Sequence, residues 1–272
     1  MGVTSILDVL EISKRFPAKN KTEAPVDALA PVSFSVQRHE FVSIIGPSGC
    51  GKSTLFNIIA GLDAPTTGRL RYDGRDEQDL RGLIGYQLQR DLLLPWRTVL
   101  DNVTLALEIR GVNASERSVR GHSLLEQYGL GSFAQRYPRE LSGGMRQRAA
   151  LMRTLLFDRE LILLDEPFGA LDAQTRLLMQ EWLLKVYVES KKTVLLITHD
   201  IEEAIFLSTR VLVMSARPGE IKCEYTINLP QPRTPEVVFE TQFAHYKKEL
   251  HHMIREESMK AFEARAVQTF DA

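Results

Sequence analysis

A glycine-rich stretch limits the possible folds of this chain more than any other segment does. It reads Gly46-Pro47-Ser48-Gly49-Cys50-Gly51-Lys52-Ser53-Thr54 and matches G-x-x-x-x-G-K-[ST]. An apolar, β-branched run at 41–45 precedes it, and an apolar helical pattern at 55–60 follows it. Strand, glycine loop and helix in this order are typical of a phosphate-binding P-loop, because the loop N–H groups and the helix N-terminus point at one anion.

This context favours a functional loop over a chance glycine-rich turn with an exposed lysine. The glycines let consecutive N–H groups turn inward without a Cβ in the way. We expect Lys52 to neutralise charge on the β- and γ-phosphates of a nucleotide, and the Ser53 hydroxyl to ligate Mg²⁺. The sequence therefore predicts a nucleotide site at 46–54.

Composition sets the broad class of the chain. Its 272 residues are 44% hydrophobic and 25% charged, which is ordinary for a soluble globular protein with one large or two modest domains. A net charge of −1 without a long basic run argues against nucleic acid as a partner. Cys50 and Cys223 are too few for a disulfide framework or a zinc cluster, which fits a reducing compartment. No secretory signal and no apolar run near the roughly 18 residues of a membrane span are evident, so work at a membrane requires a partner.

Strand-like patterns dominate the first third of the chain. They lie at 6–12, 32–36, 41–45 and 69–72, with a polar, turn-rich segment at Lys19–Pro25 that we expect to be a mobile loop and a short apolar segment at 83–88. Helical spacing follows at 98–110, 114–128 and 144–157, which predicts an inserted helical block of about 70 residues. Strand and helix then alternate at 161–164, 173–189, 193–197, 201–207 and 211–214, which indicates a parallel sheet flanked by helices.

The proline-rich segment 230–235 separates the C-terminal part of the chain. After it, apolar residues recur at helical spacing among many charges: Phe239, Phe243, Tyr246, Leu250 and Met253. This pattern predicts an amphipathic helix that docks on another surface. The histidines there, His245, His251 and His252, are interpreted as solvated side chains rather than metal ligands.

Two further motifs carry chemistry. The apolar run 161–164 ends in Asp165 and Glu166, which places Asp165 at a strand's carboxyl end, where P-loop NTPases hold a second Mg²⁺ partner. Glu166 is placed to orient or deprotonate an attacking water. Ser142 precedes the third helical pattern as a cap, and Gly143 and Gly144 leave backbone N–H groups open to an anion. The structural alternatives are two exposed acids at a strand end and a simple helix cap.

These motifs together resemble those of the ATP-binding subunits of ABC transporters. The resemblance rests on the Walker A motif at 46–54, the signature Leu-Ser-Gly-Gly-Met-Arg-Gln-Arg at 141–148 and the Walker B motif at 161–166. Four single residues extend it: Phe16 is similar to the aromatic that stacks on adenine, Gln89 to the Q-loop glutamine, Asp172 to the D-loop aspartate and His199 to the switch histidine. Gln87 competes with Gln89 for the Q-loop role, and the spacing to Leu94-Pro95-Trp96 favours Gln89.

The resemblance covers residues 6 to about 228 and implies the fold. It implies an α/β P-loop NTPase core with a parallel sheet, an antiparallel β subdomain and an inserted α-helical subdomain. The ATP-binding domain would span 5–228, with the helical subdomain at about 90–158. Residues 229–272 would form a C-terminal helical extension, whose role the sequence leaves open.

The resemblance also assigns roles within a homodimer that binds ATP and Mg²⁺. Lys52, Ser53, Asp165 and Gln89 would hold the phosphates and the metal ion in one subunit, with Asp172 joining the nucleotide site. Ser142, Gly143 and Gly144 would cap the γ-phosphate of ATP bound to the other subunit, so that ATP closes the dimer and hydrolysis reopens it. Glu166 would polarise the water, and His199 would stabilise charge on the γ-phosphate in the transition state.

One stretch after Gln89 indicates the kind of ABC protein. Leu92-Leu93-Leu94-Pro95-Trp96, with Ser215-Ala216-Arg217-Pro218-Gly219 later, resembles the nitrate, sulfonate and taurine importer branch, which includes carriers of bicarbonate and thiamine precursors. An exposed Leu-Pro-Trp segment supplies apolar anchors for a partner's helix, whereas the alternative is that Trp96 is an ordinary core residue. The resemblance thus implies permease subunits bound near Gln89 and Trp96, an indirect periplasmic or extracellular receptor, and a peripheral location on the cytoplasmic face of the cell membrane.

Two other classes of protein are weighed against the importer subunit. A soluble ABC ATPase that acts on ribosomes or DNA would carry two cassettes or large insertions, whereas this chain has one set of motifs. A binding module without catalysis would lack Glu166 or His199, and both are present. The transported solute is not readable from this chain, because the receptor and the membrane subunits select it.

Overall fold

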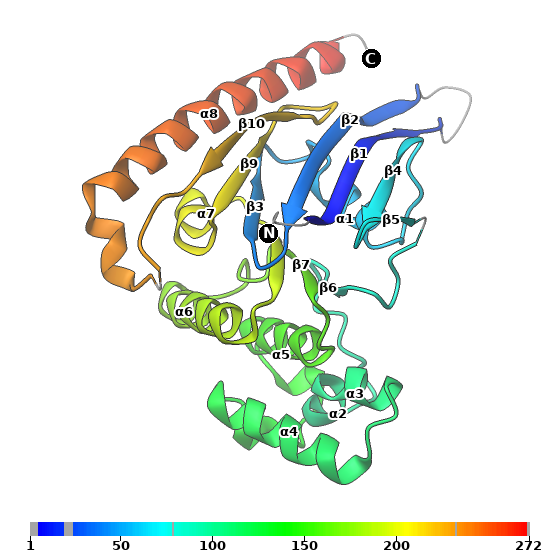
Figure 1. The fold of residues 1–272 in the computed structure, drawn as a ribbon, viewed down its shortest axis with the longest axis vertical. Helices are drawn as coiled ribbons and strands as arrows, with labels where there is room; N and C mark the ends of the chain where they lie inside the picture. Colours follow the sequence, from blue (N-terminus) through cyan, green and yellow to red (C-terminus); the bar gives the residue numbers. More distant parts are fainter. Residues whose placement is uncertain (1–4, 19–23, 78, 232, 271–272) are drawn as a thin grey trace. The chain divides into compact units, whose positions relative to one another are not determined.

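The computed structural model describes residues 5–18, 24–77, 79–231 and 233–270, without the side chains of 264–270 (Figure 1). Residues 19–23 of the expected Lys19–Pro25 loop therefore lie outside the described residues. The chain forms two compact units, one of Met1–Gly82 with Gln180–Ala272 and one of Leu83–Met179.

The first unit contains a four-stranded antiparallel sheet in the order β2-β1-β4-β5. Its strands are β1 (Ser5–Phe16), β2 (Val26–Gln37), β4 (Thr67–Tyr72) and β5 (Arg75–Glu77). One face is apolar and buried through alternate residues such as Val9, Val32 and Phe34. Gly68 allows β4 to approach β1, because its φ is +88° and a Cβ there would lie 2.3 Å from the Glu11 carbonyl oxygen.

A second set of strands in this unit leads to the P-loop. β3 (Phe41–Ile45) runs parallel to β8 (Thr193–Ile197) and β9 (Arg210–Met214), and every residue of β3 and β8 is buried. These strands confirm the predicted α/β core with parallel strands. The sheet is nevertheless mixed, because β10 (Ile221–Thr226) follows β9 through a short turn, and a strand that returns directly pairs antiparallel.

Among the described residues of this unit, three helices belong to it along their whole length: α1 (Lys52–Ile59), α7 (Ile201–Leu207) and α8 (Thr241–Phe270). As Figure 1 shows, α8 runs beside β9 and α7, and it buries Phe243 and Leu250 completely. The predicted amphipathic helix thus docks on its own unit. The prediction is wrong for Phe239, which lies in the 3₁₀ turn Pro235–Phe239 before α8 and is 88% exposed. His245, His251 and His252 are exposed on α8.

Arg233, in the segment before α8, holds that segment against the end of α7. Its side chain is buried and donates hydrogen bonds to the carbonyl oxygens of Ile205, Phe206 and Ser208, at 2.6, 3.0 and 2.7 Å. These carbonyls end α7, where the chain no longer provides N–H partners. Burial lowers the pKa of the Arg233 guanidinium to about 10, so it remains charged at neutral pH.

The second unit is mainly helical. It contains the parallel strands β6 (Gly85–Gln87) and β7 (Leu161–Asp165), the helices α2 (Val99–Val103), α3 (Leu105–Ile109), α4 (Ala114–Gln127) and α5 (Gly143–Leu156), and the first residues of α6 (Ala173–Ser190). The pattern at 98–110 predicts one helix, and the structure corrects it to two. Thr104 separates α2 from α3 with φ −89° and ψ 2°, outside the ideal helical range.

Candidate nucleotide-binding site

The P-loop, 46–54, joins β3 to α1 in the first unit. Lys52 is 8% exposed, and its ammonium donates hydrogen bonds to the carbonyl oxygens of Gly46 at 2.8 Å and Pro47 at 3.1 Å. Gly51 has φ +107°, and a Cβ there would lie 2.8 Å from the Ala28 carbonyl oxygen. The loop is therefore tightly packed, with a buried positive charge held against its backbone.

The remaining P-loop residues divide into packed and exposed positions. Ser48, Gly49 and Ser53 are exposed, and Thr54 is half-buried in the first turn of α1. Cys50 is buried, and burial raises the pKa of its thiol above the ordinary value. Since thiolate is the reactive form, Cys50 packs the loop rather than acting as a nucleophile.

His199 and Phe16 also lie in the first unit. His199 is exposed immediately after β8, and because β8 is parallel to β3, it follows the same sheet edge as the P-loop. Asp200 begins α7 by accepting hydrogen bonds from the N–H groups of Glu202 and Glu203. Phe16 ends β1, is 37% exposed, and has the Lys14 ammonium 4.9 Å from its ring centroid.

The predicted acidic residues lie in the second unit, where the structure brings two sequence-predicted side chains together. Asp165 ends β7 and is buried, and Glu166 follows it with φ +49°. Gln89 donates a hydrogen bond from Nε2 to Glu166 Oε2 at 3.1 Å. Gln87, the competing glutamine, is 2% exposed inside β6. Gln89 is therefore the glutamine whose side chain reaches the acidic pair.

The signature residues form the beginning of α5 in the same unit. Ser142 caps this helix, since its Oγ accepts the Met145 N–H at 3.3 Å, and Ser142 and Gly143 are exposed. A Cβ on Gly144 would lie 3.4 Å from the Ala170 carbonyl oxygen, so the signature packs against the segment that leads to Asp172. Asp172 caps α6 by accepting the Thr175 N–H at 3.0 Å, and this hydrogen bond holds its pKa below the ordinary value.

The segment after Gln89 is exposed where the sequence predicts a docking surface. Trp96 is 71% exposed and Leu92 is 52% exposed, whereas Leu93 is buried. The alternative that Trp96 is a core residue is therefore wrong. Asn102 on α2 is buried, and its amide bonds both the N–H and the carbonyl of Leu94.

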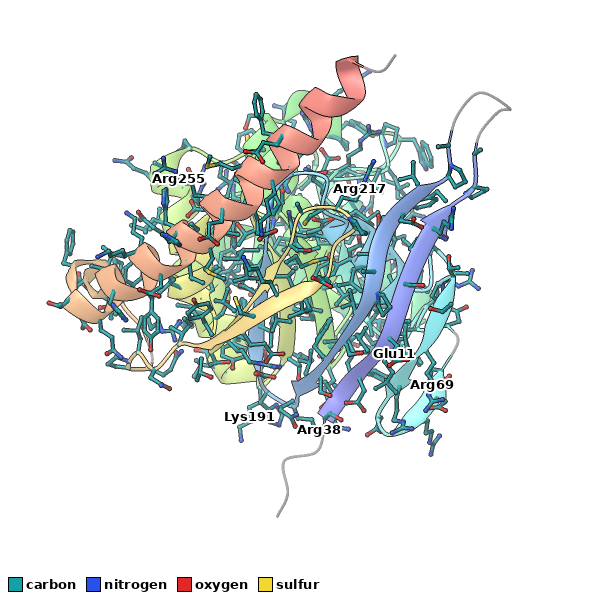
Figure 2. All side chains as sticks on the ribbon, turned by 90° about the horizontal axis from the view of Figure 1, so that it is seen from above. Glu11, Arg38, Arg69, Lys191, Arg217 and Arg255 are labelled. Atoms are coloured by element: carbon teal, nitrogen blue, oxygen red, sulfur yellow. The ribbon has the colours of Figure 1, made fainter. Side chains whose placement is uncertain are left out.

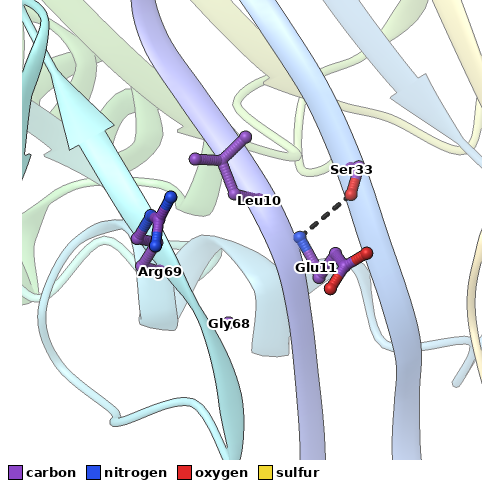
Figure 3. A pocket seen from close by; sticks show the side chains of 5 residues that line it. All are labelled: Leu10, Glu11, Ser33, Gly68 and Arg69. Carbon is purple, nitrogen blue, oxygen red and sulfur yellow. Dashed lines mark hydrogen bonds between the residues drawn. The ribbon is translucent and has the colours of Figure 1, made fainter.

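A separate hollow of about 540 Å³ lies on the antiparallel sheet of the first unit. Figure 3 shows its lining residues, Leu10, Glu11, Ser33, Gly68 and Arg69, with the Glu11 N–H bonded to Ser33 Oγ at 2.9 Å. None of the sequence-predicted site residues lines it, so it has no part in the predicted nucleotide site.

A comparison with protein families decides the classification. The family described as ABC transporter matches residues 29–169, more than half of the chain. The chain belongs to the ABC transporter family. Two curated relatives place it more narrowly. It is 40% identical to the nitrate import ATP-binding protein of Synechocystis sp. over 95% of this chain and 98% of that one. It is 48% identical to the taurine import ATP-binding protein of Rhizobium johnstonii over 75% of this chain and 78% of that one.

A solved structure supports the same classification of this ABC protein. The dimeric ATP-binding cassette MJ0796, in a post-hydrolysis state bound to ADP and Pi, is 34% identical with a TM-score of 0.75. The match covers 82% of this chain and all of that one. The expected family, the fold class and the ATP-hydrolysing class of enzyme are confirmed at this level. None of the helices among the described residues combines the length and the apolar character that a membrane span requires.

Sequence reasoning missed residues that support the site of this ABC cassette. Gln147, on α5, donates from Nε2 to the Glu166 carbonyl oxygen at 3.3 Å. It lies five residues after Ser142 inside the signature, and that position is the signal that could have identified it. No sequence motif identifies Asn102, because its hydrogen-bond partners are backbone groups of another segment.

Proposed function

We propose that this chain binds and hydrolyses ATP as the energy-supplying subunit of an importer for a small solute of the nitrate, sulfonate, taurine, bicarbonate or thiamine-precursor class. The contact of Gln89 with Glu166, directly after buried Asp165, is the observation that carries the proposal. It places a carboxylate suited to general base catalysis beside an amide suited to ligating a metal ion. The similarity to nitrate and taurine import proteins supports the solute class.

The residue types present fit Mg²⁺. Ser53 supplies a hydroxyl, Asp165 a carboxylate and Gln89 an amide carbonyl, and oxygen donors of this kind are those that Mg²⁺ prefers. Bound Mg²⁺ would neutralise charge on the ATP phosphates. Lys52 would add its own positive charge, and the P-loop N–H groups would orient the phosphate oxygens.

Glu166 and His199 would perform the proton and charge steps. Glu166 would accept a proton from the attacking water or orient it, with Gln89 fixing the direction of the carboxylate through their hydrogen bond. His199 would donate a hydrogen bond to the γ-phosphate and stabilise the negative charge that develops there. Phe16 would stack on the adenine, and Asp172 would join the site from the start of α6.

A second copy of the chain would complete each site. Ser142, Gly143 and Gly144 begin a helix of 14 residues, whose N–H groups and positive dipole end favour an anion such as the γ-phosphate. The exposure of Ser142 and Gly143 makes this end accessible to a partner's nucleotide. The dimer of the related cassette supports a homodimer here.

The permease would dock on the segment from Gln89 to Trp96. Its exposed leucine and tryptophan suit an apolar helix of the membrane subunits, which would hold this chain on the cytoplasmic face of the cell membrane. A periplasmic or extracellular receptor would then deliver the solute to those membrane subunits.

Co-purification with candidate permease subunits tests the function. The ATPase rate of the complex in liposomes, measured with and without a solute receptor, should exceed the rate of the isolated chain. A soluble ABC ATPase that takes no part in transport predicts equal rates and no stable complex. That result would contradict the importer proposal.

A further inference from the structure

Two arginines on α5 reach the same short segment of the second unit. Arg146 and Arg153 are seven residues apart, close to two helical turns, so they lie on one face of α5. Both bond to Asp91, and Arg153 also bonds to Leu92; these two residues follow Gln89 and lead into Trp96. The proposed function gives these arginines no role.

Arg153 binds the backbone of this segment. Its Nη1 donates to the Leu92 carbonyl oxygen at 2.8 Å, and its Nη2 donates to the Asp91 carbonyl oxygen at 2.6 Å. Leu92 has φ +44°, the left-handed conformation, in which successive carbonyls point the same way. One planar guanidinium therefore satisfies two adjacent carbonyls, which the single ammonium of a lysine reproduces poorly.

Arg146 links the same segment to the signature. Its Nε donates to Asp91 Oδ2 at 3.2 Å, and its Nη1 donates to the Leu141 carbonyl oxygen at 2.7 Å. Leu141 immediately precedes Ser142. Asp91 Oδ1 in turn accepts the Leu93 N–H at 3.1 Å. This carboxylate therefore connects the signature to the segment from Gln89 to Trp96, called the docking segment below.

The other end of the segment is held independently. Asn102 Nδ2 donates to the carbonyl oxygens of Leu94, Arg97 and Thr98 at 3.1, 3.2 and 2.9 Å. The backbone around Trp96 is thus fixed on both sides, while its side chain remains 71% exposed. A displacement of Trp96 must therefore move the groups that hold its backbone.

We propose that Arg153 is a positioning residue that, with Arg146, fixes the docking segment to α5, so that movement of the signature and movement of Trp96 are transmitted to each other through that helix. The inference rests on the proposed function, because it takes Ser142 as a nucleotide contact and Trp96 as a partner contact. A helix of 14 residues transmits such a movement well, since its internal hydrogen bonds make it stiff along its axis.

The test uses Trp96 as a reporter in the full chain. The parent carries Glu166→Gln, to retain ATP, and Trp182→Phe, which leaves Trp96 as the remaining one of the two tryptophans. Acrylamide quenching of Trp96 is measured with and without Mg-ATP, and sedimentation reports the dimer. We expect ATP to change the quenching constant in the parent. Arg153→Met should reduce that change to less than about a third, because methionine makes neither hydrogen bond.

Two controls separate transmission from loss of structure. Arg153→Lys retains charge and one donor group, so it should restore part of the response that Arg153→Met loses. Arg110→Met removes another arginine, which donates to the Phe157 carbonyl after α5 at 3.4 Å, and it should retain the full response. If Trp182→Phe fails to fold, hydrogen exchange of amides 91–98 with and without ATP replaces quenching.

The outcomes distinguish the inference from the proposed function. A parent that stays monomeric with ATP overturns the composite site and the inference together. A parent that dimerises without any response at Trp96 overturns the inference alone, as does an Arg153→Met chain that dimerises with the full response. Loss of the response in Arg153→Met, with ATP-driven dimerisation retained, supports the inference.

Discussion

Glu257 on α8 accepts a hydrogen bond from the Ala216 N–H at 2.9 Å, and this contact joins the C-terminal helix to the turn between β9 and β10. Arg217, labelled in Figure 2, follows in that turn. The turn contacts the P-loop at Gly219, where a Cβ would lie 2.0 Å from the Cys50 carbonyl oxygen. The helix after the predicted ATP-binding domain therefore supports, through one turn, the loop predicted to bind phosphate.

The Glu257 carboxylate makes the stability of this contact depend on pH. Burial alone raises its pKa, but hydrogen bonds from Lys222, Lys260 and the Ala216 N–H outweigh burial and lower the pKa to about 2. The pKa of Glu257 in the folded chain lies below that of an unfolded Glu, which is about 4.3. The contribution of this carboxylate to the free energy of unfolding is therefore complete above about pH 4.3 and is lost as the pH falls towards 2. Because the two lysines are partly exposed, we expect this contribution to the free energy of unfolding to be about 1 kcal/mol.

Denaturant unfolding of Glu257→Gln measures this contribution. The variant should be less stable than the natural chain at pH 7, and the difference should shrink between about pH 4.3 and pH 2. Glu256→Gln is the matched control, because Glu256 is 47% exposed and contacts Lys222 at the longer distance of 3.3 Å. A difference that is constant from pH 7 to pH 3 would refute the assignment.

Catalysis should depend on the carboxylate of Glu166. Glu166→Gln should retain ATP binding and lower turnover by about 10²- to 10⁴-fold, since the amide keeps the shape and loses the base. Lys52→Ala should weaken ATP binding itself, because it removes the buried charge of the P-loop. Calorimetric binding and phosphate release measure the two effects, and equal turnover in Glu166→Gln and the natural chain would eliminate the proposed role.

Dimerisation should require both ATP and the signature. In the Glu166→Gln chain, ATP should convert monomers into dimers, because ATP favours the state that binds it twice. Adding Ser142→Arg should block the dimer by placing bulk against the partner's nucleotide. Sedimentation with and without Mg-ATP measures this, and a fully active chain that remains monomeric would contradict the composite site.

Much of the fold was predictable because its buried strands are continuous apolar runs. The pattern at 41–45 matches β3, and the pattern at 193–197 matches β8, with every residue buried in both. β10 was not predicted from the sequence, because it alternates half-buried and exposed residues and contains Lys222 and Glu224. An edge strand of this composition has no apolar run to reveal it.

The residues of the candidate site that belong to short local motifs could be predicted from the sequence. Gln89 was selected by its spacing to Trp96, and the structure places it against Glu166. The two hydrogen bonds of Arg153 were not predictable, because a side chain bonded to carbonyls more than 60 residues away leaves no local pattern. Such contacts depend on the packing of helices, which a single sequence does not reveal.

Docking on the permease should depend on Trp96. An aromatic side chain that is 71% exposed adds little to folding, so Trp96→Ala should change the free energy of unfolding by less than about 0.5 kcal/mol. Buried in an interface, the same side chain is a typical hot spot, and its loss would cost about 2 kcal/mol or more of binding, roughly a 30-fold loss in affinity. The variant should therefore reduce complex formation and transport while sparing the basal ATPase of the isolated chain.

Transport in proteoliposomes, basal ATPase and a thermal melt together decide the role of Trp96. Val119→Ala is the control, because Val119 is an apolar residue that is 68% exposed in the same unit, on α4 rather than in the docking segment. It should leave transport unchanged. Normal transport in Trp96→Ala would refute the coupling role, and a large fall in melting temperature would show that Trp96 supports the fold. An intact melt with impaired transport would place the permease contact on the segment that Arg153 and Asn102 hold, because Trp96 is the most exposed of its large apolar side chains.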